Sequence, residues 1–155
     1  MYLGKSPNNQ HVPSFGSTRA SFASTLVLLI IFIAGLHIAA MRFNLYFSIW
    51  WFDIPMHFLG GLWSGLFVIF YSLLRTHSRG EAPSHTRVLC VGLGAAIVFG
   101  LAWELYEYLF GFTFTTKSSY GFDTIVDMIL DMLGGLTAGA YTLSNGLFRT
   151  LRHGR

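Results

Sequence analysis

The sequence predicts an all-α integral membrane protein, a polytopic up-down bundle of four transmembrane helices with both termini in the cytoplasm. Three observations predict this fold. Only 11% of the 155 residues are charged and 53% are hydrophobic, whereas a typical soluble domain is roughly 25% charged. Mean hydropathy is +0.53, and the apolar residues gather in four long runs. This composition excludes a disordered chain and argues against a soluble globular domain.

The first span is predicted at residues 21–41, which contain no charged side chain. At ~1.5 Å rise per residue, a helix of this length crosses the ~30 Å hydrocarbon layer. Residues 1–20 are polar and rich in Gly, Ser, Pro and Asn, and we expect a flexible cytoplasmic tail there. A cleaved signal peptide is the alternative. The apolar run is long for one and the polar segment before it is longer than usual, so we favour an anchored helix.

The remaining spans follow an aromatic segment at 42–55, where Trp50 and Trp51 indicate a membrane–water interface. They are predicted at about 56–74, 88–110 and 124–148, inside a membrane domain of residues 21–148. The connections are a hydrophilic segment at 75–87 and a short loop at 111–122. Glycines four residues apart, Gly61 with Gly65 and Gly135 with Gly139, permit close helix packing.

The basic residues predict the orientation in the membrane. Eight of the ten Lys and Arg residues lie in the N-terminal tail, the 75–87 connection and the basic tail at 149–155. Only Arg42 and Lys117 fall on the other side. The positive-inside rule therefore places both termini in the cytoplasm, and we expect a multi-pass protein of a bacterial inner (plasma) membrane. The basic residues are too scattered to indicate nucleic-acid binding.

The acidic residues are the most informative group in the chain. Of the seven, Glu81 lies in the predicted cytoplasmic connection, and the other six fall in the outer half of the bundle. Those six are Asp53, Glu104, Glu107, Asp123, Asp127 and Asp131. They recur three or four residues apart within each helix, and His57 follows Asp53 by four, so each set shares one helix face. A carboxylate in hydrocarbon costs roughly 2.5–3.5 kcal/mol, so these faces are expected to point into the bundle.

Several carboxylates close together cannot all stay ionised without a counter-charge, which protons or a metal ion must supply. Carboxylate oxygens with an imidazole favour a divalent ion such as Zn, Mn, Fe or Mg. The predicted metal ligands are His57, Glu104, Glu107, Asp127, Asp131, Asp123 and Asp53. No residue is assigned a catalytic role.

Several of these residues also have a purely structural interpretation. Asp53 and Asp123 each stand at a predicted helix start, where an N-cap role is as reasonable as a ligand role. His37 stands alone on the first span, and we expect it to pack or to form a hydrogen bond rather than bind metal. Trp103 is expected to pack near the Glu pair. Cys90 is the single cysteine, which excludes an intramolecular disulfide.

Three motifs, within about residues 50–140, carry a family resemblance. They are Asp53-x-x-x-His57-Phe58-x-x-Gly61, Trp103-Glu104-x-x-Glu107 and Asp123-Thr124-x-x-Asp127-Met128. In this order they resemble the YjdF-like family of predicted bacterial inner-membrane proteins, which is loosely similar to VanZ-like proteins. The resemblance implies a shared polar constellation at His57, Glu104, Glu107, Asp123 and Asp127. It implies no particular activity.

The leading functional hypothesis is a divalent-metal site in the periplasmic half of the bundle. It would serve a metal-dependent hydrolase or another enzyme that modifies lipids or the cell envelope. One alternative is a non-catalytic membrane subunit that binds a partner or a pigment. Another is a cation- or proton-coupled transporter. The sequence leaves open whether the protein is an enzyme. The expected partners are the lipid bilayer, a lipid or cell-envelope substrate, and a homo-oligomer or larger membrane complex.

Overall fold

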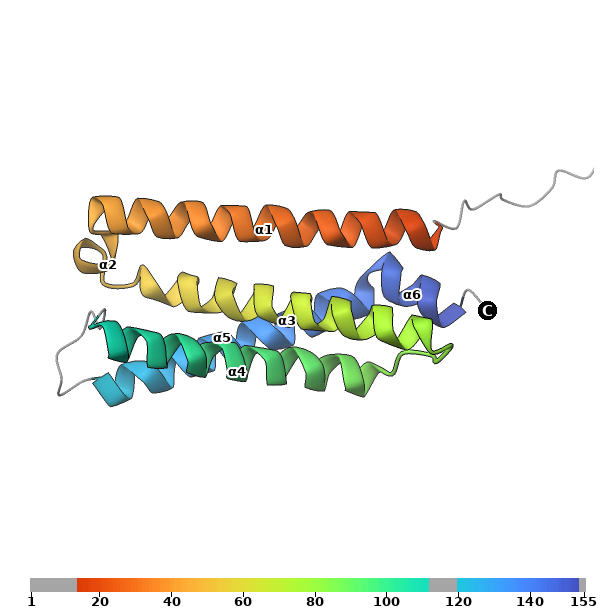
Figure 1. Ribbon diagram of the computed structural model, residues 1–155. Coiled ribbons are helices and arrows are strands. Elements are labelled where there is room, and N and C mark those ends of the chain that lie inside the picture. Colours follow the sequence, from red (N-terminus) through yellow and green to blue (C-terminus); the bar gives the residue numbers. More distant parts are fainter. Residues whose placement is uncertain (1–13, 112–119, 154–155) are drawn as a thin grey trace, which may run out of the picture.

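The computed structural model describes residues 14–111 and 120–153, and this part of the chain is entirely helical between short connections (Figure 1). The helices are α1 (Phe15–Phe43), α2 (Leu45–Ser48), α3 (Asp53–Ser78), α4 (His85–Phe110), α5 (Tyr120–Ser144) and α6 (Gly146–His153). The predicted all-α class is therefore confirmed.

Three of the described helices, α1, α3 and α4, are long and apolar enough to cross a membrane. This supports a multi-pass membrane location. The helix α5 has a similar length of 25 residues but is not one of the three candidate spans. It carries three acidic residues, Asp123, Asp127 and Asp131. The fourth span and the orientation of the termini stay predictions.

The first helix begins earlier than the sequence indicated. α1 starts at Phe15 rather than at residue 21, because the Ser14 side chain accepts a hydrogen bond from the Ser17 backbone N–H at 3.2 Å and so caps the helix. Residues 15–20, expected in a flexible tail, are helical, and residues 1–13 lie outside the described part. The helix ends at Phe43, and the next residue, Asn44, has a left-handed backbone (φ 54°) typical of a residue that terminates a helix.

The last predicted span is divided in two. Instead of one helix over 124–148 and a tail over 149–155, α5 ends at Ser144 and α6 begins at Gly146. The Asn145 side chain accepts a hydrogen bond from the Leu147 backbone N–H at 3.0 Å and stabilises this turn. The short helix α6 packs against α1 and α5, because its apolar side chains Leu147, Phe148 and Leu151 are buried in the core.

The centre of the fold is a closely packed unit of α3, α4 and α5. A Cβ atom on Gly61 would overlap the backbone of Asp131, and one on Gly134 would overlap the Phe58 carbonyl oxygen, so the backbones of α3 and α5 touch. A Cβ atom on Gly92 of α4 would lie 2.6 Å from the Gly135 carbonyl oxygen, so α4 and α5 are also in close contact. Small residues thus bring three helices within reach of one another's short side chains.

By contrast, α1 runs along one side of this unit and packs against α3 and α6 (Figure 1). Its buried residues lie near its two ends, with Phe22 and Leu26 in one half and Ala40 in the other. The Trp63 indole N–H donates a hydrogen bond to the Leu26 carbonyl at 3.0 Å and ties α3 to α1. Between these attachments, the middle of α1 faces a cavity.

Candidate metal centre

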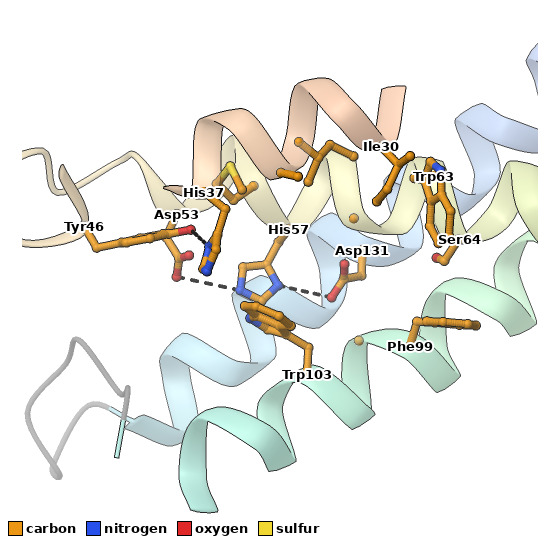
Figure 2. Close-up of a pocket in the computed structure, with 15 residues that line it drawn as sticks. Ile30, His37, Tyr46, Asp53, His57, Trp63, Ser64, Phe99, Trp103 and Asp131 are labelled. Carbon is orange, nitrogen blue, oxygen red and sulfur yellow. Dashed lines mark hydrogen bonds and ion pairs between the residues drawn. The ribbon is translucent and has the colours of Figure 1, made fainter. Parts of the chain in front are cut away.

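The candidate site is built around His57, in the second turn of α3, whose side chain is only 3% exposed. Its Nδ1 atom forms a 3.2 Å hydrogen bond with Asp131 Oδ2. Its Nε2 atom faces three further carboxylates: Asp53 Oδ2 at 3.7 Å, Asp127 Oδ2 at 3.8 Å and Glu104 Oε1 at 3.9 Å. Figure 2 shows the imidazole between Asp53 and Asp131. One ring therefore meets carboxylates from α3, α4 and α5.

The helix arrangement explains how these groups converge. The start of α3, the end of α4 and the start of α5 lie at the same end of the molecule (Figure 1). A Cβ atom on Gly100 would stand 3.0 Å from the carboxylate carbon of Asp131, and one on Gly60 would stand 3.8 Å from its Oδ1. These glycines leave room for the Asp131 carboxylate to reach His57. Glu81, the acid predicted to lie apart, forms an exposed ion pair with Arg87 at 3.6 Å in the connection between α3 and α4.

Two atoms of the site lack a hydrogen bond. Within the described residues, His57 Nε2 and Glu104 Oε1 are the buried side-chain polar atoms that have no hydrogen-bond partner. Leaving such an atom unsatisfied costs about 1–3 kcal/mol, so each one calls for an explanation. The two atoms lie 3.9 Å apart. A cation held between them would satisfy both.

Other carboxylate oxygens of the site are held by neighbours that the sequence did not single out as functional. The Thr124 hydroxyl donates to Glu104 Oε2 at 2.7 Å, and the Tyr120 hydroxyl donates to the Glu104 backbone carbonyl at 3.3 Å. The Trp103 indole N–H donates to Glu107 Oε1 at 2.9 Å. These contacts fix the orientation of the two glutamates. Of these contacts, the sequence could have indicated only the one between Trp103 and Glu107, because residues four apart lie on the same face of a helix.

The distances around His57 suit a shared ion. Two groups of ligand atoms lie within 4.8 Å of one another, Asp53–His57–Asp127 and His57–Glu104–Glu107. Ligand atoms on opposite sides of one ion, each bound at about 2.1 Å, are about 4.2 Å apart. The separations of 3.7–3.9 Å from Nε2 fall inside that limit. Both groups contain His57, whose Nδ1 is already hydrogen-bonded to Asp131, so Nε2 is the nitrogen left to bind an ion. The two groups therefore correspond to one ion that could be bound by either set of carboxylates.

Three polar residues considered from the sequence lie outside these groups. Asp131, predicted as a ligand, is one of them, and it contacts His57 Nδ1 rather than Nε2. Asp123, half-buried on α5, belongs to neither of the groups found in the described part of the chain. His37 forms the kind of hydrogen bond expected of it, between Nδ1 and the Tyr46 hydroxyl at 2.9 Å. Burial, with the Asp53 and Glu107 carboxylates, raises the pKa of the Tyr46 phenol, so this hydroxyl stays protonated.

Replacing Trp103 with phenylalanine tests whether the indole supports the site. The change removes the hydrogen bond to Glu107, and we expect the free energy of unfolding to fall by about 1 kcal/mol. Thermal unfolding in detergent, followed by circular dichroism, measures the effect. The matched control is Trp50→Phe, because Trp50 is 85% exposed. Equal stability of the two variants would contradict a supporting role for Trp103.

Comparison with known proteins places the chain in a family. No curated protein and no solved structure matches it significantly. A family model described as a predicted membrane protein, DUF2238, matches residues 15–145. The matched region runs from the first residue of α1 to just beyond α5. It includes the His57 cluster, which consists of His57 and the four acids around it, Asp53, Glu104, Asp127 and Asp131. The chain therefore belongs to the DUF2238 family of predicted membrane proteins.

Proposed function

We propose that this protein binds a divalent metal ion at His57 and uses it in a membrane enzyme that hydrolyses or modifies a lipid or cell-envelope substrate. The observation that carries the proposal is the pair of buried, unpartnered atoms, His57 Nε2 and Glu104 Oε1. An acidic cluster alone would not indicate a metal. An imidazole nitrogen buried among carboxylates, with no proton acceptor within hydrogen-bonding distance, matches the donor set that divalent ions prefer.

In this proposal each residue has a distinct role. His57 Nε2 supplies the nitrogen ligand, and Asp53, Asp127 and Glu104 supply the nearest oxygens. Asp131 accepts the hydrogen bond from Nδ1–H, which fixes the tautomer that leaves Nε2 free, as partners of metal-bound histidines commonly do. Asp131, predicted as a ligand, thus becomes a positioning residue. Glu107 is the alternative oxygen ligand in the second group.

The membrane arrangement belongs to the same proposal. We take α5 as the fourth span, with both termini in the cytoplasm of a bacterium and the His57 cluster in the outer half of its inner membrane. The resemblance to the YjdF-like family, and loosely to VanZ-like proteins, agrees with this placement. At that depth the site would meet lipid headgroups and cell-envelope precursors.

A bound Zn, Mn, Fe or Mg ion would polarise a phosphoryl or carbonyl oxygen, or lower the pKa of a bound water. The protein's own contribution is to hold the oxygens in place and to keep the site dry. Thr124 fixes Glu104, Trp103 fixes Glu107, and the Tyr46 phenol lies beside His37 at the edge of the site.

A second function remains consistent with the same contacts. A protonated His57 ring would form ion pairs with the surrounding carboxylates without any metal, as in a non-catalytic subunit whose buried charges orient the helices. The distances of 3.7–3.9 Å from Nε2 to the carboxylate oxygens are long for hydrogen-bonded pairs, which favours the metal.

Metal analysis of the purified protein separates the two functions. We expect stoichiometric metal in the wild type and at least about tenfold weaker binding in Asp127→Asn, which loses a charged ligand of nearly equal size. The matched control is Glu81→Gln, because that acid pairs with Arg87 away from the site. A wild-type protein that binds no Zn, Mn, Fe or Mg after equilibration with each ion would overturn the proposal.

A further inference from the structure

A cavity of about 370 Å³ adjoins the candidate metal centre. This volume lies within the ~300–1,000 Å³ range of small-molecule binding sites. Its walls come mainly from the middle of α1, the first half of α3 and the second half of α4. His57 and Asp131 form part of its lining, whereas Glu104, Glu107 and Asp127 do not. The cavity therefore reaches the candidate metal centre at Asp53, His57 and Asp131.

Most of the cavity surface is apolar, and ionisable side chains stand at one end of it. His37, Asp53 and His57 line the end near the α2–α3 connection, as Figure 2 shows. Ile30 and Ile33 on α1 and Phe99 on α4 line the rest, which extends toward the middle of the helices. A ligand that fits both ends has a polar head and a hydrocarbon chain.

The apolar part of the cavity lies between α1 and α4. α1 packs against α2, α3 and α6, and it meets α4 where the His37 ring stands edge-on to the Trp103 ring, with 5.8 Å between the ring centroids. Phe99, which lines the cavity from α4, is nevertheless 46% exposed. Both α1 and α4 are apolar helices long enough to span a membrane, so the exposed side of Phe99 would face lipid chains rather than water. A ligand would enter from the bilayer.

We propose that the cavity binds a lipid phosphate, with its aliphatic chain between α1 and α4 and its phosphate on the metal ion at His57. This inference rests on the proposed metal site. Without an ion, Asp53 and Asp131 would repel an anionic head. With a divalent ion bound at His57 Nε2, the phosphate oxygens can complete the coordination sphere, and burial of the chain against Ile33 and Phe99 supplies hydrophobic binding energy.

Photolabelling tests the proposal. The probe is hexadecyl phosphate that carries a diazirine near the end of its chain, added to the metal-loaded protein in lipid nanodiscs. We expect label on α1 and α4 next to the cavity. In Ile33→Trp, the larger side chain fills the cavity, and labelling should fall by about tenfold. The control is Ile31→Trp, on the same helix but 62% exposed, which should label like the wild type.

The outcomes distinguish the two proposals. Neither tryptophan variant touches a proposed ligand, so both should keep the metal. If both bind metal and label equally, the lipid cavity is wrong and the metal site stands. If the wild type binds no metal, the proposed function itself fails. Hexadecyltrimethylammonium has the same chain and a cationic head. If it displaces the probe better than unlabelled hexadecyl phosphate does, the assignment of a phosphate head is overturned.

Discussion

Replacing His57 with alanine is expected to abolish metal binding and to destabilise the protein at the same time. His57 supplies the nitrogen shared by both ligand groups, so its loss should weaken metal binding by about 100-fold or more. The change also removes the group that faces Asp53, Asp127, Asp131 and Glu104. Leaving the buried Asp131 carboxylate without its hydrogen-bond partner costs about 1–3 kcal/mol. Metal analysis and thermal unfolding in detergent measure the two effects.

The matched control is His85→Ala, because His85 is exposed at the start of α4 and contacts Arg152 at the other end of the molecule. It should keep its metal and lose little stability. A His57→Ala protein that is unstable but still binds metal as tightly as the wild type would show that the acids bind the ion without the imidazole. A His57→Gln variant separates the effects, since glutamine keeps a polar group beside Asp131 and is a poor metal ligand.

The convergence of the acids could be predicted because charge is costly in an apolar helix. Carboxylates on apolar helices are expected to point toward one another rather than toward lipid. The carboxylates of Asp53, Glu104 and Asp127 all lie within 4 Å of His57 Nε2. What spacing could not predict is which atom faces which. That Asp131 contacts Nδ1 while the others face Nε2 depends on the rotation of α5 about its axis, which Gly60 and Gly100 permit.

The supporting contacts were harder to foresee. Thr124 was visible only as the neighbour of a candidate acid, yet its hydroxyl donates to Glu104, a residue on another helix. The break before α6 had a signal in the Asn145–Gly146 pair, a dipeptide typical of turns. The surrounding apolar run concealed it, because hydropathy alone does not distinguish one long helix from two that pack against each other.

Hydropathy also could not predict that α1 packs loosely. Apolar side chains suit both lipid and a neighbouring helix, so a run of Leu and Ile on α1 does not tell which side faces which. The small residues are more informative. They concentrate on α3, α4 and α5, which pack closely, whereas a Cβ atom on Gly35 of α1 would meet nothing within 4 Å. The difference leaves room for the cavity between α1 and α4.

The close contact between α3 and α5 predicts a large effect for Gly61→Ala. A Cβ atom there would lie 2.6 Å from the Asp131 Cα atom, so α5 must move away. Overpacking of this kind costs about 1–3 kcal/mol, against a gain of up to about 1 kcal/mol in helix propensity. The displaced residue is also the partner of His57 Nδ1. We therefore expect Gly61→Ala, which adds one methyl group, to have a lower unfolding temperature and weaker metal binding than the wild type.

Gly94→Ala on α4 is the matched control, because a Cβ atom at Gly94 would meet nothing within 4 Å. It should be neutral or slightly stabilising, since alanine is the better helix former. Thermal unfolding and metal titration of both variants decide the matter. If Gly61→Ala is as stable as Gly94→Ala and binds metal equally well, then the α3–α5 contact does not position Asp131. If Gly61→Ala loses stability and metal affinity together, the helix contact and the His57 site are a single structural unit.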